Sequence, residues 1–256
     1  MDITYYDIGL NLFTRSFPDP EKIIADAEAD GICCILTGSE DRENRLVDDF
    51  VRTHQVFGTA GIHPHVADTA TEADVEEIRR IVTTNPKIVA VGETGLDYDR
   101  MFSKKENQLY FFKKLIALAE ELDKPMFLHE RDAGDDFLAC FKGHEGVCPK
   151  SVVHCYTGDK ETLARMLDMA FISALPAGSV MNGEPMHCAR PCPFCPWIGT
   201  SRDGCAYLTP RGFHLPRTNV PNNITYVAST LAKYMDVSVE ALTVQAKANT
   251  ERLFRL

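Results

Sequence analysis

Histidine and carboxylate side chains recur in the first two thirds of the chain, each directly after a short apolar run. The residues that could bind a metal or move protons are Asn11, His63, His65, Glu93, Asp97, His129 and His154. One carboxylate with two imidazoles suits Zn²⁺, Mn²⁺ or Fe²⁺, whereas Mg²⁺ prefers more oxygen ligands. A single histidine after a strand is more often a hydrogen-bonded structural residue, and only the repetition favours metal binding. The pattern predicts a divalent-metal site formed by Glu93, His129 and His154.

The elements that must position these residues alternate between apolar runs and amphipathic stretches. The predicted strands are Thr4–Ile8, Ile32–Leu36, Val56–Ile62, Ile88–Val91, Met126–Leu128, Ser151–Val153 and Ala170–Ile172. This alternation predicts parallel strands joined by right-handed crossovers. No Gly-x-Gly-x-x-Gly turn is present, which favours a (β/α)8 TIM-like barrel, with an open doubly wound sheet as the alternative. In a barrel the polar residues meet at the carboxyl ends of the strands.

Composition limits the possible partners and surroundings. The 256 residues fit one barrel or two small domains, and the net charge of -10 argues against a broad basic surface for nucleic acid. Bound divalent ions could still supply local positive charge for phosphodiester chemistry. The sequence has no apolar run long enough to cross a membrane and no secretory leader, so we expect a cytoplasmic protein. Its nine cysteines are then expected to be reduced thiols.

Five segments resemble, in order and spacing, the signatures of TatD-type metal-dependent deoxyribonucleases. They are Tyr6–Leu12, Thr59–His65, Val91–Tyr98, Phe127–Ala133 and Val153–Gly158. The resemblance covers residues 3–173 and 207–256. It implies a (β/α)8 barrel of the metal-dependent hydrolase type over residues 1–256 and one or two divalent ions. It also implies 3′→5′ hydrolysis of single-stranded DNA. We expect Mg²⁺ as the functional ion, with Zn²⁺ or Mn²⁺ as alternatives, and a monomer without membrane attachment.

The resemblance also implies roles for the residues at the strand ends. Glu93 corresponds to a metal-bridging carboxylate, with His129 and His154 as ligands of one metal. His63 and His65 correspond to residues that contact the substrate phosphate or carry protons.

Three further positions are candidate substrate contacts, and one of them departs from the family pattern. Many relatives carry His-x-His at the end of the first strand, where this chain has Gly9 and Asn11. The second metal position is weakened by this change, and Asn11 becomes a candidate substrate contact. Arg131 and Arg211 could meet phosphate, although Arg131 could equally form a surface ion pair and Arg211 could simply be solvated.

The stretch from residue 174 to residue 206 does not fit the family. The family ends its eighth strand with Glu-Thr-Asp-Ala-Pro-Tyr-Leu, and alignment on Tyr207 places Gly204 at the Asp position. Asp203, one residue early, is the remaining candidate for the catalytic carboxylate. The stretch is rich in Pro and Cys and has little hydrophobic periodicity. A DNA sequence can be written that encodes it and that, read in shifted frames, encodes segments similar to those of the family. We therefore interpret residues 174–206 as an out-of-frame translation that disrupts strands 7 and 8.

Three alternatives remain open at this point. A zinc-binding insert could use His187, Cys188, Cys192, Cys195 and Cys205. A barrel hydrolase with the same metal site could act on an amide or a small phosphoester, because such a site is generic. A chain that lacks the last carboxylate and has two scrambled strands could also be a non-catalytic remnant.

Overall fold

The structure is a computed structural model that describes residues 2–174, 215 and 218–256. These residues fall into two compact units, the first formed by residues 1–36 with 174–256 and the second by residues 37–173. The single domain expected over residues 1–256 stays a prediction. Asp203, Arg211 and, apart from Ala174, the stretch interpreted as out of frame lie outside the described residues.

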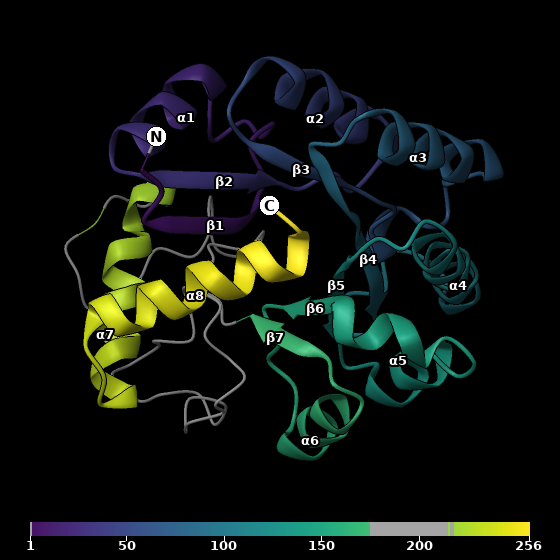
Figure 1. The fold of residues 1–256 in the computed structure, drawn as a ribbon. Coiled ribbons are helices and arrows are strands. Elements are labelled where there is room, and N and C mark those ends of the chain that lie inside the picture. Colours follow the sequence, from purple (N-terminus) through teal and green to yellow (C-terminus); the bar gives the residue numbers. More distant parts are fainter. Residues whose placement is uncertain (1, 175–214, 216–217) are drawn as a thin grey trace. The chain divides into compact units, whose positions relative to one another are not determined.

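The first unit contains a parallel β-α-β motif. Strands β1 (Tyr5–Leu10) and β2 (Ile32–Leu36) pair in parallel and are connected by helix α1 (Pro20–Ala29) (Figure 1). The helix begins with proline at its first position and is capped by Asp19, whose side chain accepts a hydrogen bond from Lys22 N at 3.0 Å. Both strands lie within about two residues of the predicted runs.

The C-terminal part of the first unit is helical, with a short 3-10 turn η4 (Pro221–Asn223) before α7 (Ile224–Met235) and α8 (Val239–Phe254). Asp236 adopts a left-handed conformation (φ 53°) that ends α7. The Ser238 side chain then caps α8 by accepting from Ala241 N at 3.0 Å. On the inner faces Leu231, Leu242, Ala246 and Leu253 are buried.

The second unit is a succession of parallel β-α repeats. Its strands follow one another in chain order as β3 (Phe57–Ala60), β4 (Ile88–Asp97), β5 (Met126–Arg131), β6 (Ser151–His154) and β7 (Ile172–Ala174). Pairing is parallel from β3 through β6. The helices are α2 (Asp41–Thr53), α3 (Glu72–Thr84), α4 (Lys105–Glu121), α5 (Gly134–Cys140) and α6 (Lys160–Asp168), and the 3-10 turns are η1 (Pro64–Val66) and η2 (Glu145–Lys150).

Two strands of the second unit differ from the predicted ranges. β4 does not stop at Val91 but continues through Asp97, because its polar end pairs with β5 in the register Gly95↔His129 and Asp97↔Arg131. Gly95 has φ 149°, and a Cβ at this position would overlap the carbonyl group of His129. β7 begins two residues later than expected because Ala170 (φ 64°) belongs to the turn that ends α6.

The helices of the second unit bury apolar residues that recur at helical spacing. Val75, Ile78 and Val82 on α3 are buried, as are Phe111, Leu115 and Leu118 on α4. Among the residues that the structure describes, no helix is both long enough and apolar enough to cross a membrane.

Candidate metal centre

One carboxylate oxygen of Glu93 is the meeting point of three imidazole rings. Oε1 accepts a hydrogen bond from His154 Nε2 at 2.7 Å and lies 3.3 Å from both His129 Nδ1 and His63 Nε2. All four side chains are buried, and Glu93 is completely excluded from solvent. They come from the carboxyl-terminal halves of β4, β5 and β6 and from the residue before η1. The strand ends therefore bring together the polar residues that the sequence pattern placed there.

Asp97 forms a second carboxylate position beside the first. Its Oδ2 accepts from His65 Nε2 at 2.6 Å and from His129 Nε2 at 3.3 Å. Since His129 Nδ1 faces Glu93, this ring bridges the two carboxylates. The two carboxylates are four residues apart on β4, and in a strand such residues lie on the same face.

The loop segments around the cluster are fixed by backbone hydrogen bonds. Glu93 N donates to Gly38 O and His63 N donates to Ser39 O, both at 2.8 Å. The amide side chain of Asn44 donates to Gly61 O at 2.9 Å and accepts from Gly61 N at 3.0 Å, directly before His63. The side chains of the cluster are thus attached to rigid backbone, as a metal centre requires.

The electrostatics of the cluster keep both carboxylates ionised. Burial alone would raise the pKa of Glu93, but the charges of His63 and His154 and hydrogen bonds from His129 and His154 outweigh it and hold this pKa well below its usual range. Burial likewise opposes ionisation of Asp97, and hydrogen bonds from His129 and His65 lower its pKa. For His129, burial acts to lower the pKa, but hydrogen bonds to Asp97 and Glu93 raise it to about 9.

The donor set fits a divalent metal ion. A ligand atom from each of His63, Glu93 and His129 lies within 4.8 Å of the others. A buried anionic oxygen surrounded by imidazoles is a donor set suited to Mn²⁺ or Zn²⁺, and Asp97 adds the oxygen that harder ions prefer. Buried ionisable groups are costly unless they are paired or bound to a metal.

His63 uses its second ring nitrogen in a backbone hydrogen bond. Its Nδ1 accepts the backbone N–H of His65 at 3.1 Å. In the neutral form of the ring this contact leaves the proton on Nε2, because a neutral imidazole has one donor and one acceptor nitrogen. His63 Nε2 lies 3.3 Å from Glu93 Oε1, and proximity alone would group His63 with the metal ligands.

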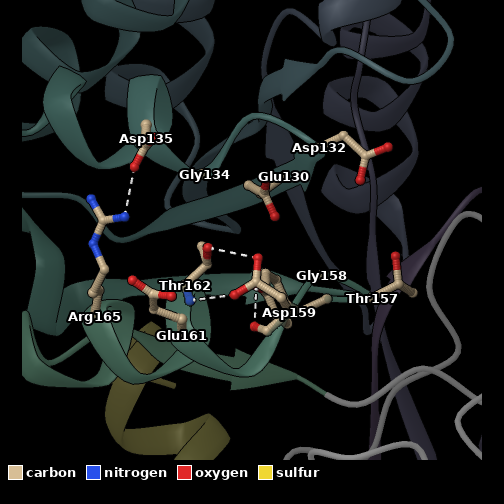
Figure 2. A pocket seen from close by; sticks show the side chains of 11 residues that line it. Glu130, Asp132, Gly134, Asp135, Thr157, Gly158, Asp159, Glu161, Thr162 and Arg165 are labelled. Atoms are coloured by element: carbon tan, nitrogen blue, oxygen red, sulfur yellow. Dashed lines mark hydrogen bonds and ion pairs between the residues drawn. The ribbon is translucent and has the colours of Figure 1, made fainter.

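An acidic hollow of about 730 Å³ is lined by residues from the end of β5, from α5 and α6, and from the segment between β6 and α6 (Figure 2). We use this name for the cavity whose charged lining residues are Glu130, Asp132, Asp135, Asp159, Glu161 and Arg165. The single guanidinium is paired with Asp135 at 2.6 Å, and the Asp159 carboxylate accepts from Thr162 N and Oγ1 (Figure 2). Burial raises the pKa of Glu130, which follows His129 on β5.

The remaining predicted site residues do not all join the cluster. Asn11 is buried directly after β1 in the first unit. Arg131 Nε forms an ion pair with Asp99 at 3.2 Å. Asp203 and Arg211 are outside the described residues.

The sequence pattern placed Asp97 among the residues able to bind a metal or move protons but did not predict that it contacts His65 and His129. The predicted strand ended at Val91, so the alternation of faces was not carried forward to Glu93 and Asp97. The available signal was the Glu-x-x-x-Asp spacing within one extended segment, which places both carboxylates on the same face.

Comparison with known proteins assigns the chain to a family. The chain matches the family described as TatD related DNase over residues 6–255. It is 33% identical over 262 residues to the 3'-5' ssDNA/RNA exonuclease TatD of Pantoea ananatis, covering 98% of this chain and 99% of that protein. The protein of the same name from Erwinia billingiae is 32% identical over 259 residues, again covering 98% and 99%.

Solved structures agree on the fold. The TatD homolog YJJV from Escherichia coli K12 has a TM-score of 0.86 at 21% identity, with both chains covered completely. A TatD family hydrolase from Entamoeba histolytica has a TM-score of 0.80 at 23% identity and covers 99% of this chain and 98% of its own. These likenesses confirm the predicted α/β fold of the TatD-like TIM-barrel type. The chain therefore belongs to the TatD related DNase family and is an enzyme, a hydrolase of the metal-dependent nuclease type.

Proposed function

We propose that this chain is a divalent-metal-dependent exonuclease that removes nucleotides from the 3′ end of single-stranded DNA. The observation that carries the proposal is the buried Glu93 oxygen, which lies within 3.3 Å of nitrogen atoms of three imidazole rings. Relatives at about one third identity over nearly the whole chain are named 3'-5' ssDNA/RNA exonucleases. Mg²⁺ is the proposed functional ion, with Mn²⁺ or Zn²⁺ as alternatives. A monomer located in the cytoplasm remains our prediction.

Glu93, His129 and His154 would hold the ion. A bound divalent ion supplies a water that is nucleophilic near neutral pH and positive charge for the phosphate oxygens. Asp97 orients this set, because its Oδ2 accepts from His129 and fixes the ring that faces Glu93.

His63 and His65 would act on the phosphate and its protons. The proton that His63 carries on Nε2 can be donated to a phosphate oxygen, since Nδ1 is already occupied by the His65 amide. His65 donates from Nε2 to Asp97 at 2.6 Å, which fixes the orientation of the ring. We therefore propose proton transfer and phosphate contact for His63 and His65 rather than metal ligation.

The substrate contacts predicted from sequence stand as proposals. Arg131 is half-buried and paired with Asp99, so a phosphate would have to compete with that carboxylate. Asn11 and Arg211 are proposed to contact substrate, and Asp203 is the proposed remnant of the last catalytic carboxylate.

The test follows single-stranded oligonucleotides that carry a label at either the 5′ or the 3′ end. With Mg²⁺ or Mn²⁺, we expect the 3′ label to be released first, as a mononucleotide. The strand that carries the 5′ label is expected to shorten stepwise. Chelation by EDTA is expected to stop both. Internal cuts, release from the 5′ end, or the absence of product with every divalent ion tried would overturn the proposal.

We also infer that residues 174–206 are an out-of-frame translation that impairs the literal chain. A corrected frame is expected to read Glu-Thr-Asp-Ala-Pro before Tyr207 and to raise the activity of the repaired protein. Resequencing the coding DNA tests this: intact DNA that encodes the chain as written, without compensating insertions or deletions, would refute it.

A further inference from the structure

An exposed aromatic ring lies next to the metal centre. Phe102 is 66% exposed, more than any other large hydrophobic side chain in the described ranges. Its ring centroid is 4.8 Å from that of His65, in an edge-to-face arrangement at 75°. His65 in turn donates to Asp97, which accepts from His129. Phe102 is thus one imidazole away from the carboxylate and histidine network.

The segment that carries this ring, residues 98–104, is held in place at several points. We call it the rim loop. Asp97 Oδ1 accepts the backbone N–H of Arg100 at 2.9 Å. The Gln108 side chain donates to Ser103 O at 2.8 Å, and Asp68 N donates to the Ser103 hydroxyl at 3.1 Å. Because the loop is anchored on both sides of Phe102, the ring is presented to solvent on a fixed backbone.

Two cationic residues flank the exposed ring. Arg100 and Lys104 are both exposed on the rim loop, in a chain whose net charge is -10. Met101 is also 46% exposed, so the ring has an apolar neighbour. Arg100 and Lys104 each lie two positions from Phe102 in the sequence, and the loop's carboxylate, Asp99, is paired with Arg131. Proteins that bind single-stranded nucleic acids combine an aromatic ring, on which a base stacks, with cationic groups for the backbone.

We propose that Phe102 is a stacking platform for a nucleobase of the single strand, beside the phosphate that the metal centre cleaves. This inference rests on the proposed nuclease function and adds a substrate-positioning residue to it. Every base has a π-face, so stacking here gives affinity without sequence preference. The platform distinguishes nucleic acids from phosphoesters that lack a base.

The main experiment measures binding of fluorescein-labelled oligothymidylate to the full chain with Mg²⁺. The 3′ linkages are phosphorothioates, which slow cleavage. Phe102→Leu, which keeps an apolar side chain without a π-face, is expected to weaken binding about 5- to 150-fold, the range that corresponds to about 1–3 kcal/mol per stacked base. Phe102→Tyr is expected to restore it. The same strand with abasic 3′ positions should bind wild type and Phe102→Leu within about twofold of each other.

Tyr110 provides the matched control. It is 47% exposed on α4, where its ring contacts Phe111 and Lys114 rather than the centre. Tyr110→Leu is expected to leave binding unchanged. Equal binding of the normal strand by wild type and Phe102→Leu would overturn the inference, and so would a Phe102→Leu loss that persists on the abasic strand.

A second measurement reports stacking directly. The chain has one tryptophan, so Phe102→Trp adds a reporter to a weak background. Its fluorescence is expected to be quenched by oligothymidylate and not by the abasic strand. Quenching by both, or by neither, would contradict base stacking at this position.

The outcomes separate this inference from the function on which it rests. If wild type cleaves single strands and Phe102→Leu binds and cleaves them equally well, only the platform fails. If wild type neither binds nor cleaves single strands with any divalent ion, the proposed function fails as well.

Discussion

Two regions that follow the strands of the metal centre have opposite chemical character. After β4, the rim loop presents the Phe102 ring between Arg100 and Lys104. After β5 and β6, the acidic hollow presents five carboxylates and one guanidinium that is already paired with Asp135. Asp97 directly precedes the rim loop, whereas Glu130 follows His129 within β5 and therefore points to the opposite face of that strand.

This difference indicates the direction from which a polyanion can approach. Carboxylates around the hollow repel phosphate, whereas cations on the rim loop attract it. On our proposal, a strand that stacks on Phe102 brings its terminal phosphate to Glu93 and His129. The proposal predicts that substrate affinity in this acidic protein comes from a small local surface and from bound metal.

The largest effect is expected from a substitution in the metal centre itself. Glu93→Gln keeps the shape but removes the anionic oxygen that faces three imidazoles. We expect loss of stoichiometric metal and a fall in mononucleotide release of about 10²- to 10³-fold or more, the scale of losing one charge-stabilising group. Metal analysis and single-turnover kinetics measure both. A variant with wild-type metal content and rate would show that the centre lies elsewhere.

The next largest effect is expected from a substitution of Asp97, which connects the metal centre to the rim loop. Asp97→Asn can still accept the Arg100 N–H through its amide oxygen but loses the charge that holds His65 and His129. We expect metal affinity or activity to fall about 10- to 100-fold, as for other residues that orient metal ligands. Calorimetric titration with Mn²⁺ measures the affinity. Unchanged affinity together with unchanged activity would mean that Asp97 serves only the backbone.

The smallest effects come from single charges in the two regions. Lys104→Ala is expected to weaken binding of single strands a few fold and to reduce the salt slope by about one, as for loss of one phosphate contact. Asp132→Asn, in a left-handed position (φ 51°) that Asn tolerates, is expected to strengthen binding slightly. Binding measured from low to high salt checks both. We predict affinity changes of opposite sign for the two variants. A change of affinity in the same direction for both would contradict the difference between the two regions.

Much of the fold could be predicted from the sequence because hydrophobic periodicity determines it. The range Ile32–Leu36 was predicted without error. The predicted strand Ile88–Val91 ended too early, because the residues that follow it are polar although they continue the strand. The end of β4 is polar but fully buried, since it pairs with β5 through Gly95.

The site was predictable in composition but not in arrangement. Strand-end position predicted that Glu93, His129 and His154 converge, because the carboxyl ends of parallel strands meet, and the structure brings these side chains together. Spacing could not show that His63 Nδ1 accepts the His65 amide, which fixes its proton, or that Asp97 serves both the histidines and the rim loop. These relations depend on hydrogen bonds between segments far apart in the sequence.

The most direct test of the central claim is the position of a bound ion. Crystals of the full chain soaked in Mn²⁺ and measured at the manganese absorption edge locate it by anomalous scattering. We predict a peak bound by Glu93, His129 and His154. A peak only in the acidic hollow, held by Glu130, Asp132 or Asp159, would contradict the assignment of the metal centre.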